Sequence, residues 1–270
     1  MSASTRAAAA ATPTRSAGGQ ARSRAVCALD LPGFGRSERA KRVYTPRLMT
    51  DAVHAALDAL LRRTGAPAVD VLALSLGCEF AARVAAERPQ AVRSLALVSP
   101  TGFNGTRAWQ EPEGATREVP GMHAVLTGPG WGGPLFRALT RPGVVRYFLR
   151  RTWGEQAIDE GLWAACVATA REPGAEHAPL QFLCARLFSA DVHTVYDRLS
   201  VPVWMSHGVR GDFVDYRQKS RWQGRANWRF AVFPTGAIPY FEVPQSFFEA
   251  YEAFLEDAAS AATHPPRLSV

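Results

Sequence analysis

Short apolar runs alternate with helical stretches over much of this chain. In the clearest case, the run Val69-Asp70-Val71-Leu72-Ala73-Leu74 reaches a helical stretch at 76–87 with only Ser75 between them. Nearly continuous apolar strands that alternate with helices are typical of a parallel sheet whose two faces are covered by crossover helices. The pattern therefore predicts an α/β fold with a mostly parallel sheet and flanking helices.

Further elements can be placed from the same periodicity. A helix before the run at 69–74 is predicted to begin at a cap on Thr50 or Asp51 and to end at Gly65. A last helix at 245–255 carries aromatic and apolar residues on one face. The predicted sheet has about five strands, which are the apolar runs at 25–29, 69–74, 94–98, 203–206 and 228–233.

The middle of the chain has a different character. Residues 103–195 are rich in Gly, Pro and Trp and then helical, without a strong strand. We interpret them as a helical cap insertion over one end of the sheet, between core segments at 25–102 and 196–257. Residues 1–24 lack apolar periodicity, so we favour a disordered leader or a misplaced start over a transit peptide. Residues 258–270 are predicted to be a disordered tail.

Charge and cysteine content exclude several classes of function. The formal net charge is +7, but four of the positive charges are arginines of the acid-free segment 1–24, which argues against a nucleic-acid footprint. The four cysteines are far apart and show no C-x-x-C spacing, which argues against a zinc site or a disulfide scaffold and favours a reducing, cytoplasmic location. No phosphate loop and no membrane-spanning apolar run is present in the sequence. We therefore expect no cofactor, no metal, no nucleic-acid partner and no membrane span.

Five segments, in order, resemble the α/β-hydrolase superfamily. Each is similar to one family motif: a D-x-P-G-x-G-x-S turn, the nucleophile elbow, the strand end that follows the elbow helix, the acid loop and the histidine loop. In this chain they read Asp30-Leu31-Pro32-Gly33-Phe34-Gly35-Arg36-Ser37, Ala73-Leu74-Ser75-Leu76-Gly77, Val98-Ser99-Pro100-Thr101-Gly102, 202–214 and 235–244. The resemblance covers about 220 residues and implies the fold of that family, with a serine nucleophile on a sharp strand-to-helix turn.

The resemblance assigns roles to individual residues. Ser75 takes the position of the nucleophile, and the backbone amide of Leu76 takes the position of one oxyanion donor. Ala73 and Gly77 are the small residues that would let strand and helix approach each other. The alternative is that Ser75 is only a helix cap, so the sequence leaves open both a reactive and an inert serine.

The other two members of the triad depart from the family pattern. A serine nucleophile needs a base, and the base needs an acid that holds its tautomer. The histidine position of the G-H-x-P-x-x-E-x-P loop is filled by Ala237, which cannot carry a proton. In the acid loop, the family's acid position holds Gly211, and Asp212 follows one residue later as a candidate acid or a solvated turn residue. His207 ranks first among the candidate substitute bases, ahead of His123 and His177.

A further family element has no counterpart in this sequence. The second oxyanion amide comes from a loop after a central strand, which would precede residue 25, and nothing in residues 1–24 resembles that strand.

Three interpretations of the function follow from these motifs. The chain is a hydrolase of esters, thioesters or amides with a degenerate triad and weak or lost activity, a non-catalytic relative that binds a small apolar ligand or a protein partner, or a truncated product. For the first reading, an apolar acyl pocket is predicted to involve Trp109, Met122, Trp131 and Phe136. The oligomeric state is not predicted.

Overall fold

The computed structural model of the protein describes residues 25–128, 130–154, 157–210 and 213–263. They contain one sheet of four parallel strands in the order β1-β2-β3-β4. The strands are β1 (Val69–Leu74), β2 (Val92–Val98), β3 (Val203–Gly208) and β4 (Trp228–Phe233). The mostly parallel sheet predicted from the sequence is confirmed. Residues 1–24 lie outside the described part, so the disordered leader stays a prediction.

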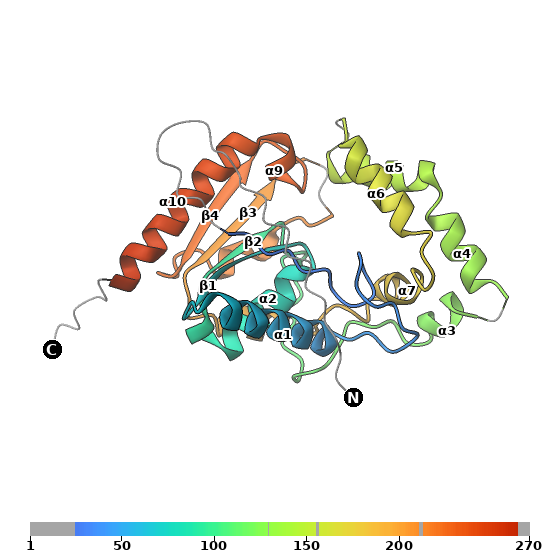
Figure 1. Cartoon of the computed structure of the whole chain (residues 1–270), viewed down its shortest axis with the longest axis horizontal. Helices are drawn as coiled ribbons and strands as arrows, with labels where there is room; N and C mark the ends of the chain where they lie inside the picture. Colours follow the sequence, from blue (N-terminus) through green and yellow to red (C-terminus); the bar gives the residue numbers. More distant parts are fainter. Residues whose placement is uncertain (1–24, 129, 155–156, 211–212, 264–270) are drawn as a thin grey trace.

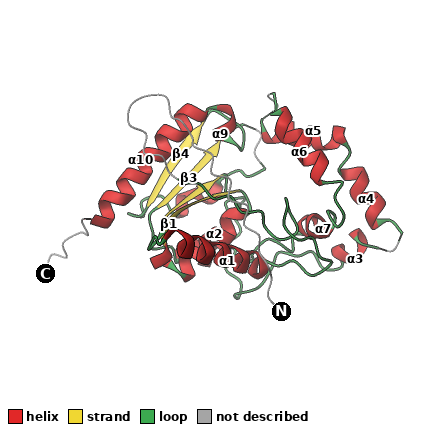
Figure 2. Cartoon of the chain, in the orientation of Figure 1, coloured by secondary structure: helices red, strands yellow, loops and turns green. Residues whose placement is uncertain are grey.

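Helices cover both faces of the sheet (Figures 1 and 2). On one face, α1 (Pro46–Thr64), α2 (Gly77–Glu87) and α8 (Val192–Asp197) enclose the largest apolar cluster, in which Leu95 and Met205 are fully buried. On the other face, α10 (Pro244–Thr263) packs Phe247 and Phe254 against Trp204 of β3. This arrangement of a buried parallel sheet between two helical layers is the one that nearly continuous apolar strands require.

The predicted strand at 25–29 is not a strand in the structure; its residues form an irregular segment that leads into the turn at Asp30. A strand needs a neighbouring strand to bond with. In the sheet order that the resemblance implies, this neighbour lies between the segment at 25–29 and β1. Among the described residues, β1 pairs with β2 alone and forms the edge of the sheet. Leu72 and Leu74 of β1 are 42% and 36% exposed, as expected of an edge strand with one uncovered face.

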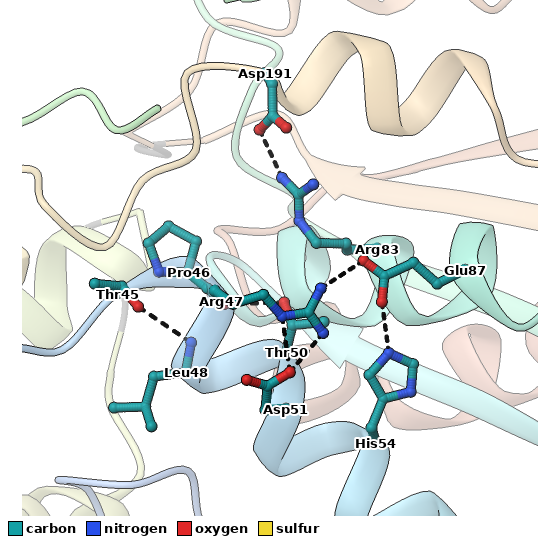
Figure 3. Close-up of polar contacts among 10 residues, drawn as sticks. All are labelled: Thr45, Pro46, Arg47, Leu48, Thr50, Asp51, His54, Arg83, Glu87 and Asp191. Atoms are coloured by element: carbon teal, nitrogen blue, oxygen red, sulfur yellow. Dashed lines mark hydrogen bonds and ion pairs between the residues drawn. The ribbon is translucent and has the colours of Figure 1, made fainter. Parts of the chain in front are cut away.

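Helix α1 begins earlier than the sequence predicted, as Figure 3 shows. The cap is Thr45, whose hydroxyl accepts a hydrogen bond from the Leu48 amide at 3.1 Å, and Pro46 occupies the first helical position. Proline is favoured there because its fixed φ suits the helix and its missing N–H would have no partner anyway. Thr50, one of the two predicted caps, is buried inside the helix and donates to the Pro46 carbonyl.

Helix α10 continues to Thr263, beyond its predicted end at residue 255. The prediction of a disordered tail from residue 258 is therefore wrong for residues 258–263. That segment reads Ala-Ala-Ser-Ala-Ala-Thr. It lacks large apolar side chains, but alanine has the highest intrinsic helix propensity and extends a helix that is already anchored. Residues 264–270 lie outside the described part.

The segment between β2 and β3 is helical apart from its loops, and most of its helices form a row to one side of the sheet (Figure 1). No helix among the described residues has the length and apolar character that crossing a bilayer requires. Besides α8, the helices between β2 and β3 are α3 (Met122–Leu126), α4 (Gly132–Leu139), α5 (Pro142–Thr152), α6 (Glu160–Thr169) and α7 (His177–Leu183). Three short helical elements lie elsewhere: η1 (Pro89–Ala91), η2 (Arg217–Arg221) and α9 (Pro239–Glu242).

Candidate active site

Ser75 occupies a sharp turn between the end of β1 and the start of α2. Its φ is 52°, in the left-handed region that a residue with a side chain adopts only under strain. The turn is fixed by the Ser75 amide, which donates to the Val98 carbonyl at the end of β2 at 2.9 Å. The side chain is exposed, and its hydroxyl has no hydrogen-bond partner among the described residues. This is the geometry that presents a serine hydroxyl at the carboxyl end of a sheet.

The start of α2 provides one donor for an anion. Leu76 is the residue before the first turn of the helix, and its amide has no acceptor in the described part of the chain. Free amides and the helix dipole both favour negative charge at this end. One expectation about the turn is not met: a Cβ added at Gly77 would meet nothing within 4 Å, so close approach does not require glycine there.

A cavity of about 450 Å³ opens at Ser75. It is walled by the ends of β1 and β2, by the loops after them, and by the segment between β2 and β3. The lining residues are Leu74, Ser75, Ser99, Thr101, Gly102, Asn104, Arg117, Thr152, Phe182, Phe188, Phe213, Val214, Ala237 and Ile238. The walls are largely apolar with a few polar groups, which is the usual composition of a small-molecule site.

Ala237 lines the same cavity on a tightly held loop. Its amide donates to the Thr152 carbonyl at 2.8 Å, and its carbonyl accepts from the Ser99 hydroxyl at 2.7 Å. The preceding residue must be glycine, because a Cβ at Gly236 would lie 2.3 Å from the Thr152 carbonyl oxygen. The Glu242 carboxylate accepts from the Gly236 amide at 2.7 Å and closes the turn. The loop therefore holds residue 237 in the lining of the same cavity as Ser75. Its side chain is a methyl group, which cannot accept the proton of a serine nucleophile.

Comparison with known families settles the relationship of this chain. The alpha/beta hydrolase fold family matches residues 18–242, which is most of the chain. The chain belongs to the α/β-hydrolase fold family.

Several solved structures of similar fold are those of hydrolases. A serine hydrolase involved in carbazole degradation superposes with a TM-score of 0.63 at 15% identity, covering 85% of this chain and 78% of that one. A membrane phospholipase A gives 0.61 at 21% identity, with coverage of 86% and 70%. A probable hydrolytic enzyme from Pseudomonas aeruginosa gives 0.59 at 21% identity, with coverage of 85% and 75%. At these identities the likeness shows the fold alone.

One curated protein is similar over a shorter stretch. The dihydrolipoyllysine-residue acetyltransferase component of an acetoin cleaving system from Cupriavidus necator is 42% identical over 78 residues. The match covers 29% of this α/β-hydrolase-fold chain and only 20% of that protein's length.

His207, the first-ranked substitute base, lies at the end of β3 and does not line the cavity. Its Nδ1 is 2.7 Å from the Gly208 carbonyl oxygen, and its Nε2 is 3.1 Å from the Lys219 ammonium. The ring stacks on Tyr216 with centroids 3.9 Å apart. Because Lys219 can only donate, Nε2 is the acceptor and Nδ1 carries the proton. In this arrangement both ring nitrogens of His207 bond to groups other than Ser75.

The other described histidines do not line the cavity either. His177 bonds through Nδ1 to the Arg39 carbonyl, and His54 of α1 pairs with Glu87 of α2 at 2.7 Å (Figure 3). His123 lies on α3. None of the histidines that the structure describes therefore lines the cavity that Ser75 lines.

His193 is a structural histidine whose protonation should couple to stability. Its Nδ1 accepts from the Trp109 amide at 3.0 Å, and its Nε2 donates to the Gly102 carbonyl at 2.6 Å, so both nitrogens are used only in the neutral form. Burial lowers the pKa of His193 below its usual 6.5, although the bond to Gly102 opposes this. The unfolded chain therefore binds the extra proton more readily. The stability should be full above pH 6.5 and fall as the pH drops below that value.

Chemical denaturation at a series of pH values tests this expectation. His193→Gln keeps a donor and an acceptor but cannot titrate, so its stability should fall less between pH 7 and pH 5 than that of the wild type. Parallel pH profiles for the two proteins would contradict the role given to His193.

Asp212, the candidate acid, lies outside the described residues. The loop just after it does reach the cavity, because Phe213 and Val214 are lining residues. The next carboxylate along the chain, that of Asp215, bonds to other groups. It accepts a hydrogen bond from the Gly105 amide at 3.0 Å and pairs with Arg217 at 3.1 Å.

The aromatic residues predicted to form an acyl pocket do not line the cavity. Phe136 is buried between helices of the segment 103–195, and the indole of Trp131 donates to the Val125 carbonyl at the surface. The aromatic walls come instead from Phe182, Phe188 and Phe213. Met122 and Trp109 likewise lie outside the lining. Helix periodicity identified apolar faces in this segment, but it could not tell which face meets the cavity.

A buried charged group beneath the cavity was missed by the sequence analysis. Glu79 of α2 is 1% exposed, and its carboxylate accepts from the Thr101 hydroxyl at 2.6 Å, the Ser189 amide at 2.8 Å and Arg117 at 3.4 Å. Burial raises the pKa of this carboxyl, opposed by the charge of Arg117. A sequence signal existed: Glu79 and Arg83 are four residues apart within an otherwise apolar stretch of α2.

No group of three or more histidine, cysteine or acidic side chains among the described residues is arranged to hold a metal ion. The described part of the site therefore consists of the Ser75 hydroxyl, the free Leu76 amide, one arginine, a few neutral polar side chains and apolar walls.

Proposed function

We propose that this α/β-hydrolase-fold protein is a slow serine hydrolase that acts on a small apolar ester, thioester or amide. The observation that carries the proposal is the strained Ser75 turn, which places an unpartnered hydroxyl in a cavity beside the free amide of Leu76. In acyl transfer, the hydroxyl attacks the carbonyl carbon and the amide stabilises the oxyanion that forms.

The rate is proposed to be low because the triad is degenerate. Ala237 fills the position at which the family carries its histidine, and no described histidine lines the cavity. Without a base, the hydroxyl proton is not removed and the alkoxide is scarce. Loss of the base in a triad costs about 10⁶-fold in turnover in a well-studied protease, because the triad residues act as a unit.

Segment 103–195 is proposed to act as the cap of the site. It contributes Asn104, Arg117, Thr152, Phe182 and Phe188 to the cavity, more lining residues than any single loop of the sheet. A cap of this kind excludes water and selects the substrate.

A cytoplasmic location is also proposed. All four cysteines are free thiols, and Cys78 and Cys184 are buried within the fold. Reduced, dispersed cysteines are usual in proteins of reducing compartments.

Labelling with a fluorophosphonate probe tests the function. We expect slow labelling of the purified protein, complete only after hours, and none in Ser75→Ala. The same pair should show weak, Ser75-dependent hydrolysis of an activated short-chain ester. Fast, stoichiometric labelling lost in Ser75→Ala would contradict the proposed impairment, because another base would then activate the serine.

The absence of a base from the described lining favours a second candidate, a non-catalytic protein that binds a small apolar ligand in the same cavity. Under this alternative, neither labelling nor hydrolysis exceeds that of Ser75→Ala, while an apolar ligand still binds saturably.

A further inference from the structure

Arg117 is the one charged side chain among the described residues that line the cavity. Its position is set by three contacts with neighbouring groups. Nε donates to the Ser189 carbonyl at 2.9 Å, one Nη2 hydrogen is directed to Glu79 at 3.4 Å, and the guanidinium lies 4.4 Å from the ring centroid of Trp109. These contacts hold the planar group before any ligand arrives.

The guanidinium keeps donors for a ligand. Arginine has five N–H groups, and two of them are used by Ser189 and Glu79. The remaining donors have no acceptor among the described residues, and the side chain stays 15% exposed. An arginine held on one side and open on the other is arranged to bind an anion with two parallel hydrogen bonds.

Glu79 does not occupy the side of the guanidinium that meets the cavity. Its carboxylate is 1% exposed, is absent from the lining, and accepts hydrogen bonds from Thr101 and Ser189 as well as Arg117. The negative end of the pair therefore points into the fold, and the positive end meets the cavity. Among the lining residues in the described ranges, no carboxylate competes for the guanidinium.

The rest of the cavity defines the other half of the ligand. Phe182, Phe188 and Ile238 form apolar walls, and Asn104 and Thr152 add neutral polar groups. A single cation matches a singly charged anion, and bidentate geometry matches a carboxylate.

We propose that the site selects ligands with an apolar, aryl-bearing body and a free carboxylate, which binds Arg117. The inference deepens the proposed hydrolase function and, for the substrate, rests on it: the ester or amide group would lie at Ser75 and the carboxylate at Arg117.

The test compares 4-phenylbutanoate with 4-phenylbutanamide, which has the same shape without the charge, by titration calorimetry with the full chain. The wild type is expected to bind the acid about tenfold or more tightly than the amide. Arg117→Gln should remove this preference and leave the affinity for the amide within about twofold. The matched control is Arg107→Gln: Arg107 also stacks on Trp109, at 4.1 Å, but does not line the cavity. This control should keep the preference.

Equal affinity of the wild type for the acid and the amide overturns the proposal. This result needs no variant, so the proposal can be contradicted even if Arg117→Gln does not fold. Absence of saturable binding of both compounds also overturns it, as does an undiminished preference in folded Arg117→Gln. The measurement is independent of catalysis. A carboxylate preference that persists in Ser75→Ala, together with no hydrolysis in the wild type, would remove the hydrolase function and keep the anion site.

Discussion

Replacing Asp191 with alanine is expected to lower the free energy of unfolding by about 3–5 kcal/mol. Asp191 lies 2.6 Å from Arg83 of α2, and the two side chains are only 4% and 7% exposed (Figure 3). Removal of the carboxylate leaves a buried guanidinium without its counter-charge, and water cannot replace the lost partner without opening the structure. The cost is therefore mainly that of the unpaired charge and not that of one contact.

Urea denaturation measures this loss, and the same region offers a matched control. Arg47 and Asp51 form an ion pair of the same length, 2.6 Å, with side chains that are 43% and 60% exposed (Figure 3). Asp51→Ala should cost less than about 1 kcal/mol, because water screens and replaces an exposed pair. Similar losses for the two variants would show that burial does not govern the Arg83–Asp191 pair. Replacement of both Arg83 and Asp191 by leucine should recover much of the stability.

Introducing a histidine by Ala237→His should raise the rate of fluorophosphonate labelling of Ser75 by about ten- to a hundredfold, at or below the lower limit of what a positioned general base supplies. The residue is buried on a loop fixed by Thr152, Ser99 and Glu242, and it faces the cavity that Ser75 lines. An imidazole there has room within 450 Å³. Rescue should be incomplete, because no acid is established to hold its tautomer and only one oxyanion amide is present in the described site.

The labelling rate as a function of pH is the informative measurement. In Ala237→His it should rise through the titration of the new imidazole, near its ordinary pKa of about 6.5. Ala237→Asn has a similar polar shape without a basic nitrogen and should label as slowly as the wild type. An equal gain in both variants would assign the effect to loop rearrangement, and no gain in either would contradict the placement of residue 237.

The elements that the sequence predicted well are those fixed by local pattern. The first and last residues of the strand Trp228–Phe233 were predicted correctly, and so were those of Val69–Leu74. Each of these strands is an apolar run between strong breakers. The segment at 25–29 has a similar composition but no partner strand among the described residues, and composition alone cannot reveal whether a partner exists. The start of α1 was predicted too late because Thr45-Pro46 is a better start signal than Thr50-Asp51. The end of α10 was predicted too early because alanine is a poor marker of burial but a strong helix former.

The candidate site was predictable only in its motif residues. Ser75, Leu76 and Ala237 follow from short motifs, whose backbone geometry is local. The lining by Arg117, Phe182 and Phe188 depends on how a long segment folds back on the sheet, and residues separated by more than a hundred positions meet there. The role of Glu79 needed the same tertiary information, since its partners Arg117 and Ser189 are remote in the sequence.

The strand that presents the nucleophile is bonded on one side only, and this affects how firmly Ser75 is held. In the described chain, β1 exchanges hydrogen bonds with β2 alone, and its exposed leucines contribute little packing. Local opening of such a strand costs less free energy than opening of β2 or β3, whose amides are enclosed on both sides. Amide protons of β1 should thus exchange with solvent sooner than those of the inner strands. The strained turn at Ser75 depends on a bond to Val98, so each opening of β1 would also release that strain and move the hydroxyl out of register with the Leu76 amide.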